Sequence, residues 1–318
     1  MSLPRLLRRR PWASALLACA LIAPAVYALT PASDAAPASS PTHPPLWKVS
    51  DKDNSLYLLG SFHLLKTSDY PLSQDVEAAF ADAESLVFEV TPAELADPAN
   101  AAKMQAAAGY SGDQRLSTVL PADVRDKLVA RMGEAAFAQL DPYEPWFINL
   151  QMLLATASQM GFQFDKGLDN HLMQRAAQAG KPTSGLEGIE SQFKVMESAP
   201  MSEQVAGLKD LVDNPAEMPR MLNQMHGAWR SSDDATLTAL MLKEMREKTP
   251  VSYRLMNVQR NDAWLPKLRL LLDKGGKDDA LVVVGTLHLL GEDGLVRKLR
   301  ASGYTVERIC TGCGGSKR

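Results

Sequence analysis

A short sequence pattern occurs twice in this chain, once near each end, at residues 56–65 and 281–290. Each copy is an apolar run that ends in Gly-x-x-His-Leu-Leu, with the histidines at His63 and His288. Ligands of open α/β sheets bind in the crevice at the carboxyl ends of the strands, so we expect both imidazoles to lie in one cleft. The duplication predicts a metal or acid–base site built from distant parts of the sequence.

The segments around each copy predict two β-α-β units. The expected strands cover 55–60 and 85–90 in the first unit and 280–285 and 304–309 in the second, the expected helices cover 71–83 and 292–302, and a further strand covers 46–50. Alternating or wholly apolar short runs between turn residues favour strands, whereas apolar positions three or four residues apart favour helices.

The middle of the chain, about 92–274, has a different character. Its amphipathic patterns predict helices broken by proline and glycine, clearest over 150–164 and 169–179, with one short strand near Pro182. The predicted fold is α/β with α+β character. Two β-α-β units share one mixed sheet in a single domain over 46–310, and a large helical insert separates them.

The N-terminus predicts export. Residues 1–28 combine an arginine-rich start with an uncharged apolar run and small residues suited to signal peptidase, which indicates a signal peptide. Two alternatives are a retained membrane anchor and lipidation at Cys19. A tether rich in Pro, Ala and Ser follows over 29–45. We therefore expect a periplasmic or extracellular protein that contacts membrane only through an uncleaved or lipidated N-terminus.

Composition excludes some partners. The chain of 318 residues is 46% hydrophobic and 22% charged, as in soluble globular proteins, and its net charge is −3. That charge predicts no nucleic-acid binding and no adhesion to anionic membranes.

Two cysteines remain beyond the leader, Cys310 and Cys313, and we expect the tail over 311–318 to be disordered. A local disulfide is the favoured interpretation for an exported protein, ahead of redox chemistry. Two thiols alone do not complete a four-ligand zinc site.

Carboxylates are expected beside the paired histidines. Glu89 lies in an apolar strand, where a charge is costly unless it is paired or coordinated; the alternative is an edge position facing solvent. Glu187, which follows the short strand near Pro182, is the second candidate; the alternative is an ordinary carboxylate in a loop or at a helix N-terminus. The other histidines, His43, His171 and His226, are assigned to structure or solvent.

Taken together, these motifs resemble the TraB/GumN family, whose relatives include the Tiki-type metalloproteases. The resemblance runs from about Trp47 to Ile309 and depends on an ordered set of short motifs. The set comprises the two Gly-x-x-His motifs, the strand Glu89, Gly167-Leu168-Asp169, Gly185-Leu186-Glu187 with Gln192, Arg260-Asn261 with Trp264, and Gly303-Tyr304-Thr305-Val306. One departure is Ser61, where the family more often has threonine, and serine keeps the hydroxyl.

The resemblance implies a hydrolase that depends on a divalent metal, with His63, Glu89 and His288 as ligands. Manganese, cobalt and zinc all accept imidazole and carboxylate ligands. Glu187 is then expected to act as general base or to orient a ligand, and Arg260 to stabilise an oxyanion or to form a structural ion pair.

The expected substrate is a peptide or protein, since some relatives cleave peptide bonds. The alternative is a protein that binds a peptide or small ligand in the same cleft without turnover. Haem held by the two histidines is a third, less favoured interpretation, because no aromatic-rich pocket segment is evident.

Overall fold

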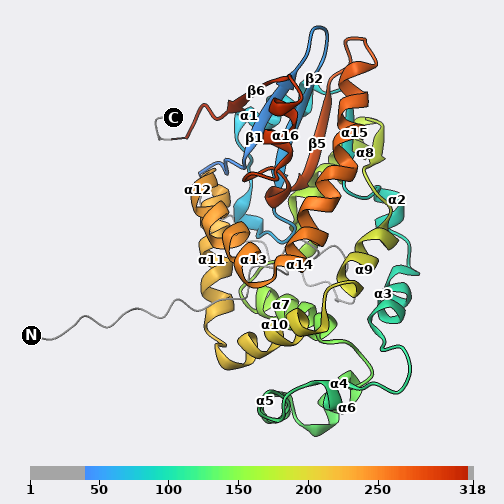
Figure 1. Ribbon diagram of the computed structural model, residues 1–318. Helices are drawn as coiled ribbons and strands as arrows, with labels where there is room; N and C mark the ends of the chain where they lie inside the picture. Colours follow the sequence, from blue (N-terminus) through green and yellow to red (C-terminus); the bar gives the residue numbers. More distant parts are fainter. Residues whose placement is uncertain (1–39, 314–318) are drawn as a thin grey trace, which may run out of the picture.

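A computed structural model of the chain describes residues 40–313 (Figure 1). The predicted signal peptide and most of the tether lie outside the described residues. Across the described part of the chain, no helix combines the length and the apolar character needed to cross a bilayer. The first described contacts with the fold come from Thr42, which is buried and donates to the carbonyl of Asp69 at 2.6 Å.

Six strands form one mixed sheet in the order β4-β3-β5-β2-β1-β6, which confirms the predicted fold class. The strands are β1 (Leu46–Ser50), β2 (Ser55–Ser61), β3 (Ser85–Phe88), β4 (Thr183–Gly185), β5 (Ala280–Gly285) and β6 (Thr305–Ile309). β4, β3, β5 and β2 are parallel neighbours, whereas β1 pairs antiparallel with both β2 and β6. Every residue of β2 and β5 is buried, as expected for central strands covered on both faces.

The chain leaves β2 and β5 in opposite directions across the sheet. From β2 it passes through α1 (Gln74–Asp82) to β3, beyond β5; from β5 it passes through α16 (Leu295–Ala301) to β6, beyond β2 and β1. Right-handed crossovers in opposite directions place their helices on opposite faces of a sheet. The carboxyl ends of β2 and β5 therefore meet at a topological switch point, where open sheets bind their ligands.

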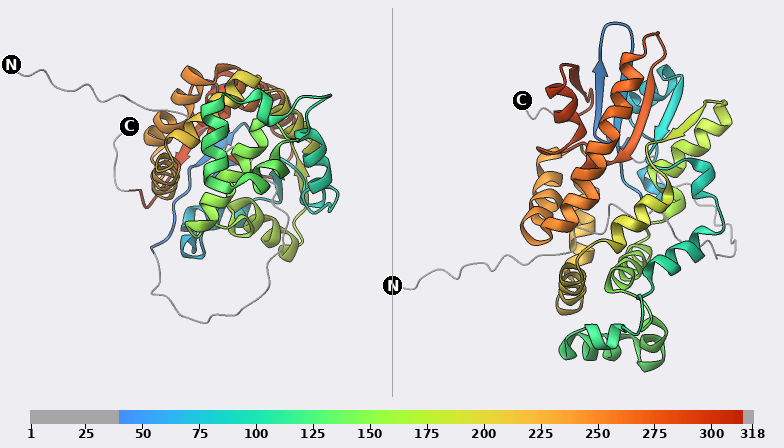
Figure 2. Two further views of the ribbon diagram at one scale, coloured as in Figure 1. Left: turned by 90° about the horizontal axis from the view of Figure 1, so that it is seen from below. Right: turned by 45° about the vertical axis from the view of Figure 1, so that its right-hand side comes forward.

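The insert between β3 and β5 is helical apart from β4. Its helices are α2 (Pro92–Leu95), α3 (Asn100–Ala108), α4 (Leu116–Val119), α5 (Ala122–Met132), α6 (Glu134–Leu140), α7 (Pro145–Gln159), α8 (Leu168–Ala179), α9 (Ile189–Glu197), α10 (Met201–Asp213), α11 (Glu217–Arg230), α12 (Asp234–Leu237), α13 (Lys243–Lys248), α14 (Pro250–Tyr253) and α15 (Gln259–Asp273). Two π-helical turns, η4 (Thr238–Leu242) and η5 (Arg254–Val258), interrupt the later part. The sheet occupies one end of the molecule, and α4, α5 and α6 lie farthest from it (Figure 2).

The predicted helix over 150–164 is displaced in the structure. Helix α7 begins at Pro145, because the ring presets the backbone angle of a first helical turn. It ends at Gln159, and Gly161 follows with a φ of 83°, a left-handed conformation that suits glycine after a helix. The predicted helix over 169–179 matches α8 to within one residue.

Candidate functional site

Four parallel strands each place one polar side chain just beyond their carboxyl ends. In the order of the sheet, Glu187 follows β4, Glu89 follows β3, His288 follows β5 and His63 follows β2. The register brings these ends together, because Phe88 pairs with both Gly185 and Val283. The paired motifs therefore meet at the carboxyl ends of the two central strands, β2 and β5.

The imidazole of His63 is oriented by Asp169, near the start of α8. Nδ1 lies 2.7 Å from Asp169 Oδ2, which also accepts a bond of 2.5 Å from the Ser61 hydroxyl. Burial alone would lower the pKa of His63, but the charge and hydrogen bond of Asp169, with help from Glu89, raise it to about 8. Nδ1–H thus donates to the carboxylate, and Nε2 is buried without a hydrogen-bond partner.

Helix α8 reaches this position because Gly167 precedes it. A Cβ at Gly167 would collide with the backbone carbonyl of His63, so a larger residue would push the helix away from the site. The close approach explains why glycine stands two residues before Asp169.

The second imidazole, His288, is held by α15. Its Nδ1 lies 2.7 Å from Asn261 Oδ1, and its ring packs against Trp264 with centroids 4.4 Å apart. Because the amide oxygen can only accept, Nδ1 carries the proton and Nε2 has the free lone pair. Arg260 Nη1 donates to that lone pair at 3.1 Å. Burial, followed by the Arg260 charge, lowers the pKa of His288 well below its usual value.

The two glutamates share the guanidinium of Arg260. Nη2 lies 2.6 Å from Glu89 Oε2 and 2.5 Å from Glu187 Oε1, and Nε donates to the same Glu187 oxygen at 3.0 Å. Gln192 Nε2 bridges both carboxylates at 3.1 Å each. Glu89, Glu187, Gln192 and Arg260 are therefore joined in one network, which Arg260 extends to His288, and Glu89 does not face solvent at an edge strand.

A small gap lies between the first histidine and Glu89, over Gly285. A Cβ built on Gly285 would stand 3.1 Å from His63 Nε2, 3.2 Å from Glu89 Oε1 and 3.6 Å from His288 Cδ2. The unpartnered nitrogen and the carboxylate oxygen thus converge on a space that exists because residue 285 has no side chain. Both imidazoles also present Nε2 inward while Nδ1 is anchored, which is the usual support for metal-bound histidines.

The donor set fits a divalent cation, provided that Arg260 moves away from Nε2 of His288. The site contains three carboxylates (Glu89, Glu187 and Asp169), one guanidinium and two imidazoles. The sum of their formal charges is −2 when both imidazoles are neutral. His288 Nε2 lies 4.0 Å from Glu89 Oε1, but Arg260 occupies its lone pair. Of the described residues, the set whose three ligand atoms already lie within 4.8 Å of one another is instead His43, Cys310 and Cys313.

The network is closed to solvent in this conformation. Its histidines, Glu89 and Arg260 are each 4% exposed or less, and the adjoining cavity measures about 20 Å³, room for about one water molecule. Leu237 and Met241, both buried, also line this cavity.

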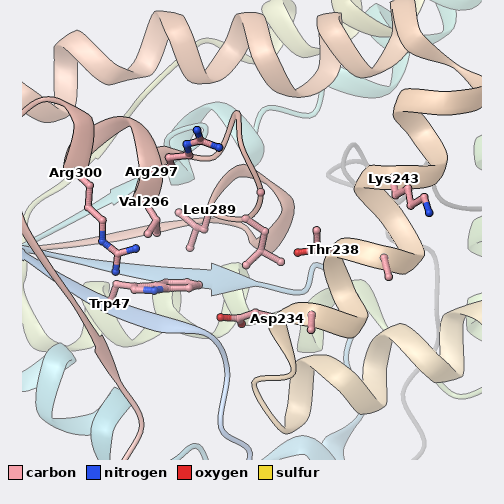
Figure 3. A pocket seen from close by; sticks show the side chains of 12 residues that line it. Trp47, Asp234, Thr238, Lys243, Leu289, Val296, Arg297 and Arg300 are labelled. Carbon is pink, nitrogen blue, oxygen red and sulfur yellow. The ribbon is translucent and has the colours of Figure 1, made fainter. Parts of the chain in front are cut away.

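An open groove of about 620 Å³ lies along the segment from α12 to α13 (Figure 3). Asp234, Thr238 and Lys243 line it from α12, η4 and α13, while Leu289 lines it one residue beyond His288. The other lining residues are Trp47, Ala235, Ala239, Leu290, Gly291, Val296, Arg297 and Arg300. Three of its charged side chains are basic and one is acidic. The residues around η4 thus line both the groove and the closed cavity.

The network contains residues whose roles we did not predict from the sequence. Asp169, Asn261, Gln192 and Trp264 stood only within the motifs of the family resemblance. Their roles depend on contacts across the fold, and nearness in sequence to Gly167 (Asp169) or to Arg260 (Asn261, Trp264) was the one local signal. Gly285 had a clearer signal, since it is the glycine of the second repeated motif.

The remaining internal histidines have structural contacts. His226 Nε2 lies 2.9 Å from both oxygens of the buried Asp69, which Arg230 also approaches at 3.1 Å. His171 packs against the ring of Tyr70, with centroids 4.3 Å apart.

Comparisons with known proteins agree with the motifs. The sequence model of the TraB/PrgY/gumN family matches residues 45–308. The chain is 27% identical over 250 residues to proteins named "Uncharacterized protein YbaP" from Escherichia coli (strain K12) and from Shigella flexneri. Those alignments cover 77% of this chain and 87% of each relative. No solved structure matches significantly.

Proposed function

Because this chain belongs to the TraB/PrgY/gumN family, we propose that it is an exported hydrolase, dependent on a divalent metal, that cleaves peptide bonds. The observation that carries the proposal is the buried, unpartnered Nε2 of His63, which faces Glu89 across the gap over Gly285. An imidazole nitrogen without a donor or acceptor is costly in a protein interior, and a metal ion would satisfy it.

His63, Glu89 and His288 would hold the ion, which we propose to be manganese, cobalt or zinc. When bound, such an ion lowers the pKa of a coordinated water and so supplies a nucleophile near neutral pH. Asp169 and Asn261 anchor Nδ1 of each imidazole, so that Nε2 faces the ion. Because the pKa of His63 is about 8, an ion that binds near neutral pH would displace the proton on its Nε2. For His288 to contribute, Arg260 Nη1 must leave its nitrogen.

Two residues are proposed to act on the substrate. Glu187 would accept a proton from water through Oε2, which receives a long hydrogen bond of 3.3 Å from Trp264 Nε1, whereas Oε1 receives three shorter ones from Arg260 and Gln192. Arg260 would move from His288 toward the carbonyl under attack, where its fixed fork of donors can stabilise an oxyanion. Its bonds to both glutamates keep the guanidinium beside the reacting atoms in either position.

Substrate entry requires a conformational change, since the cavity beside the histidines admits about one water molecule. We propose that a peptide lies in the groove of Figure 3 and reaches the site when Leu237 and Met241 move aside. These residues flank and belong to a π-helical turn, a feature that often occurs at functional sites.

Elemental analysis of the purified protein tests the metal, alongside titration with Mn²⁺, Co²⁺ and Zn²⁺. We expect one ion per chain in the wild type, with the affinity lowered at least about 100-fold in His63→Ala and in His288→Ala. His171→Ala is the matched control, because it removes a half-buried imidazole outside the network. Circular dichroism should show the same helical content in all four proteins.

A quenched-fluorescent peptide library then separates hydrolysis from binding. Metal-dependent cleavage that is lost in both site variants would support a peptidase. Stoichiometric metal with peptide binding but no cleavage would instead support the alternative, a protein that sequesters its ligand. If the wild type takes up none of the three ions, the proposed metal site is wrong.

A further inference from the structure

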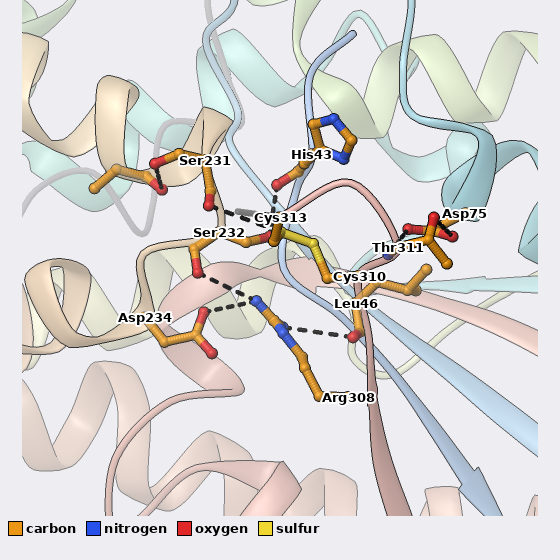
Figure 4. The surroundings of a disulfide bond; sticks show 11 residues. His43, Leu46, Asp75, Ser231, Ser232, Asp234, Arg308, Cys310, Thr311 and Cys313 are labelled. Carbon is orange, nitrogen blue, oxygen red and sulfur yellow. Dashed lines mark hydrogen bonds and ion pairs between the residues drawn. A yellow bond between two sulfur atoms is a disulfide. The ribbon is translucent and has the colours of Figure 1, made fainter. Parts of the chain in front are cut away.

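A second group of metal-ligating side chains lies where the two ends of the domain meet (Figure 4). His43 precedes β1, Cys310 follows β6, and these strands pair from Leu46 opposite Ile309. The cysteines form a disulfide with each other, which confirms the favoured interpretation of the sequence. One ligand atom from each of His43, Cys310 and Cys313 lies within 4.8 Å of the other two.

The histidine ring is placed against the cysteine turn. Its Nδ1 is buried without a hydrogen-bond partner. A Cβ at Gly312, between the cysteines, would collide with the ring, so the turn can approach the imidazole only with glycine there. The sequence assigned His43 to the tether, and nothing in its surroundings along the chain indicated this contact.

Both sides of the group are anchored by bonds that do not involve sulfur. The backbone N–H of His43 donates to the carbonyl of Arg230 at 2.9 Å, and the Ser232 hydroxyl donates to the carbonyl of His43 at 2.6 Å. On the other side, the backbone N–H and hydroxyl of Thr311 both donate to Asp75 at 2.8 Å. Breaking the disulfide therefore leaves the three ligands close together.

We propose that the reduced protein binds one thiophilic metal ion, Zn²⁺ or Cu⁺, through His43, Cys310 and Cys313. Two thiolates and an imidazole suit these ions, and three protein ligands leave one position open on zinc. A dithiol reductant supplies two electrons and two protons to the disulfide and becomes a disulfide itself. Metal binding then releases both thiol protons.

The disulfide form and the metal-bound form connect different segments of the chain. The disulfide closes only a short local loop, whereas a metal bound to His43 as well ties the segment before β1 to the segment after β6. Metal binding to the folded protein should therefore raise its thermal stability, and the increase should grow with the logarithm of the free ion concentration. This site is independent of the proposed hydrolase.

Cobalt is the probe that tests the proposal. The full chain carries Cys19→Ser, His63→Ala and His288→Ala, so that neither the leader thiol nor the first site contributes. After anaerobic reduction, we expect one Co²⁺ per chain with thiolate-to-cobalt charge-transfer absorption. The oxidised protein should show no such absorption, and Zn²⁺ should displace the cobalt and raise the melting temperature.

Ligand variants in the same background identify the site. Cys310→Ser with Cys313→Ser should abolish the charge-transfer band, and His43→Ala should weaken cobalt binding at least about tenfold while the band persists. His171→Ala should change neither. Absence of the band in the reduced parent, with its far-ultraviolet circular dichroism intact, would overturn the proposal; equal affinity in His43→Ala would remove the histidine from it. If the reduced parent unfolds without metal, recovery of its circular dichroism on adding Zn²⁺ would support the site, and failure to recover would overturn it.

Discussion

Arg260 Nη1 lies 3.1 Å from Nε2 of His288, so a permanent cation occupies the lone pair that a metal would need. The same guanidinium bonds both glutamates of the network. Arg260 is therefore suited to balance the buried carboxylates in the closed state and to act elsewhere once an ion is bound.

Arg260→Lys separates these roles. Lysine keeps the charge but loses the fork that spans two carboxylates. We expect metal binding to persist, because His288 Nε2 becomes available, while kcat falls about 100-fold. Arg125→Lys, at an exposed surface ion pair on α5, is the control. A variant with lower unfolding free energy but unchanged kcat would show that Arg260 only holds the insert to the sheet.

Gly285→Ala tests whether the gap between His63 and Glu89 is the ion's position. The backbone angle φ of residue 285 is −50°, which alanine adopts freely, so the effect should come from the methyl group alone. That methyl would stand 3.1 Å from His63 Nε2. We expect metal affinity to fall by at least about 100-fold, measured by calorimetry.

The matched control is Gly227→Ala, within α11. A Cβ there meets nothing within 4 Å, and alanine favours helix by up to about 1 kcal/mol, so this variant should be slightly more stable and bind metal normally. Normal metal affinity in Gly285→Ala would place the ion elsewhere.

Asp169→Asn tests the support of His63. Removing the carboxylate leaves burial as the main influence, so the pKa of His63 should fall from about 8 to below its ordinary value. Imidazole proton signals followed by NMR against pH in the metal-free protein measure this shift. Metal affinity should decrease by about 10- to 100-fold.

Asp165→Asn, an exposed aspartate on the turn before α8, is the control and should alter neither quantity. An unchanged His63 titration in Asp169→Asn would mean that Asp169 does not set the charge of the imidazole.

The repeated motif and the strand carrying Glu89 were accessible from the sequence because their signals are local. An apolar run with a polar residue just past its end places His63, Glu89 and His288 at one edge of a parallel sheet. The roles of Asp169 and Asn261 could not be predicted from the sequence, since each contacts its histidine from a helix of the insert. No local pattern records that the start of α8 packs, through Gly167, against the backbone of His63 beyond β2.

The same reasoning applies to the second group. The C-x-x-C spacing predicted a local disulfide, which depends on four consecutive residues. The approach of His43 depends on the pairing of β1 with β6, the first and last strands along the chain. Edge pairing between chain ends leaves no periodic signal in either segment.

Asp69 makes the pH dependence of folding testable. It is fully buried and lies within 3.1 Å of His226 and Arg230, and it accepts the backbone N–H of Lys66 at 2.8 Å. Burial opposes ionisation, but these three partners together hold the pKa of Asp69 below its usual value. A depressed carboxyl pKa contributes stability above the unfolded pKa of about 3.9, and that stability is lost as pH falls through the folded value.

Asp69→Asn should therefore destabilise the protein by about 1.5–3 kcal/mol at pH 7, because it removes the carboxylate charge that pairs with Arg230 and accepts the hydrogen bond of Lys66. Its melting temperature should also fall less steeply than that of the wild type below pH 5, since the group that loses its charge is already gone. Thermal scans between about pH 3 and pH 7, a range that includes the pKa of about 3.9 of an aspartate in the unfolded chain, measure both effects. Asp113→Asn, at an exposed position, is the control and should follow the wild type. Parallel curves for Asp69→Asn and the wild type would show that another carboxylate governs acid unfolding.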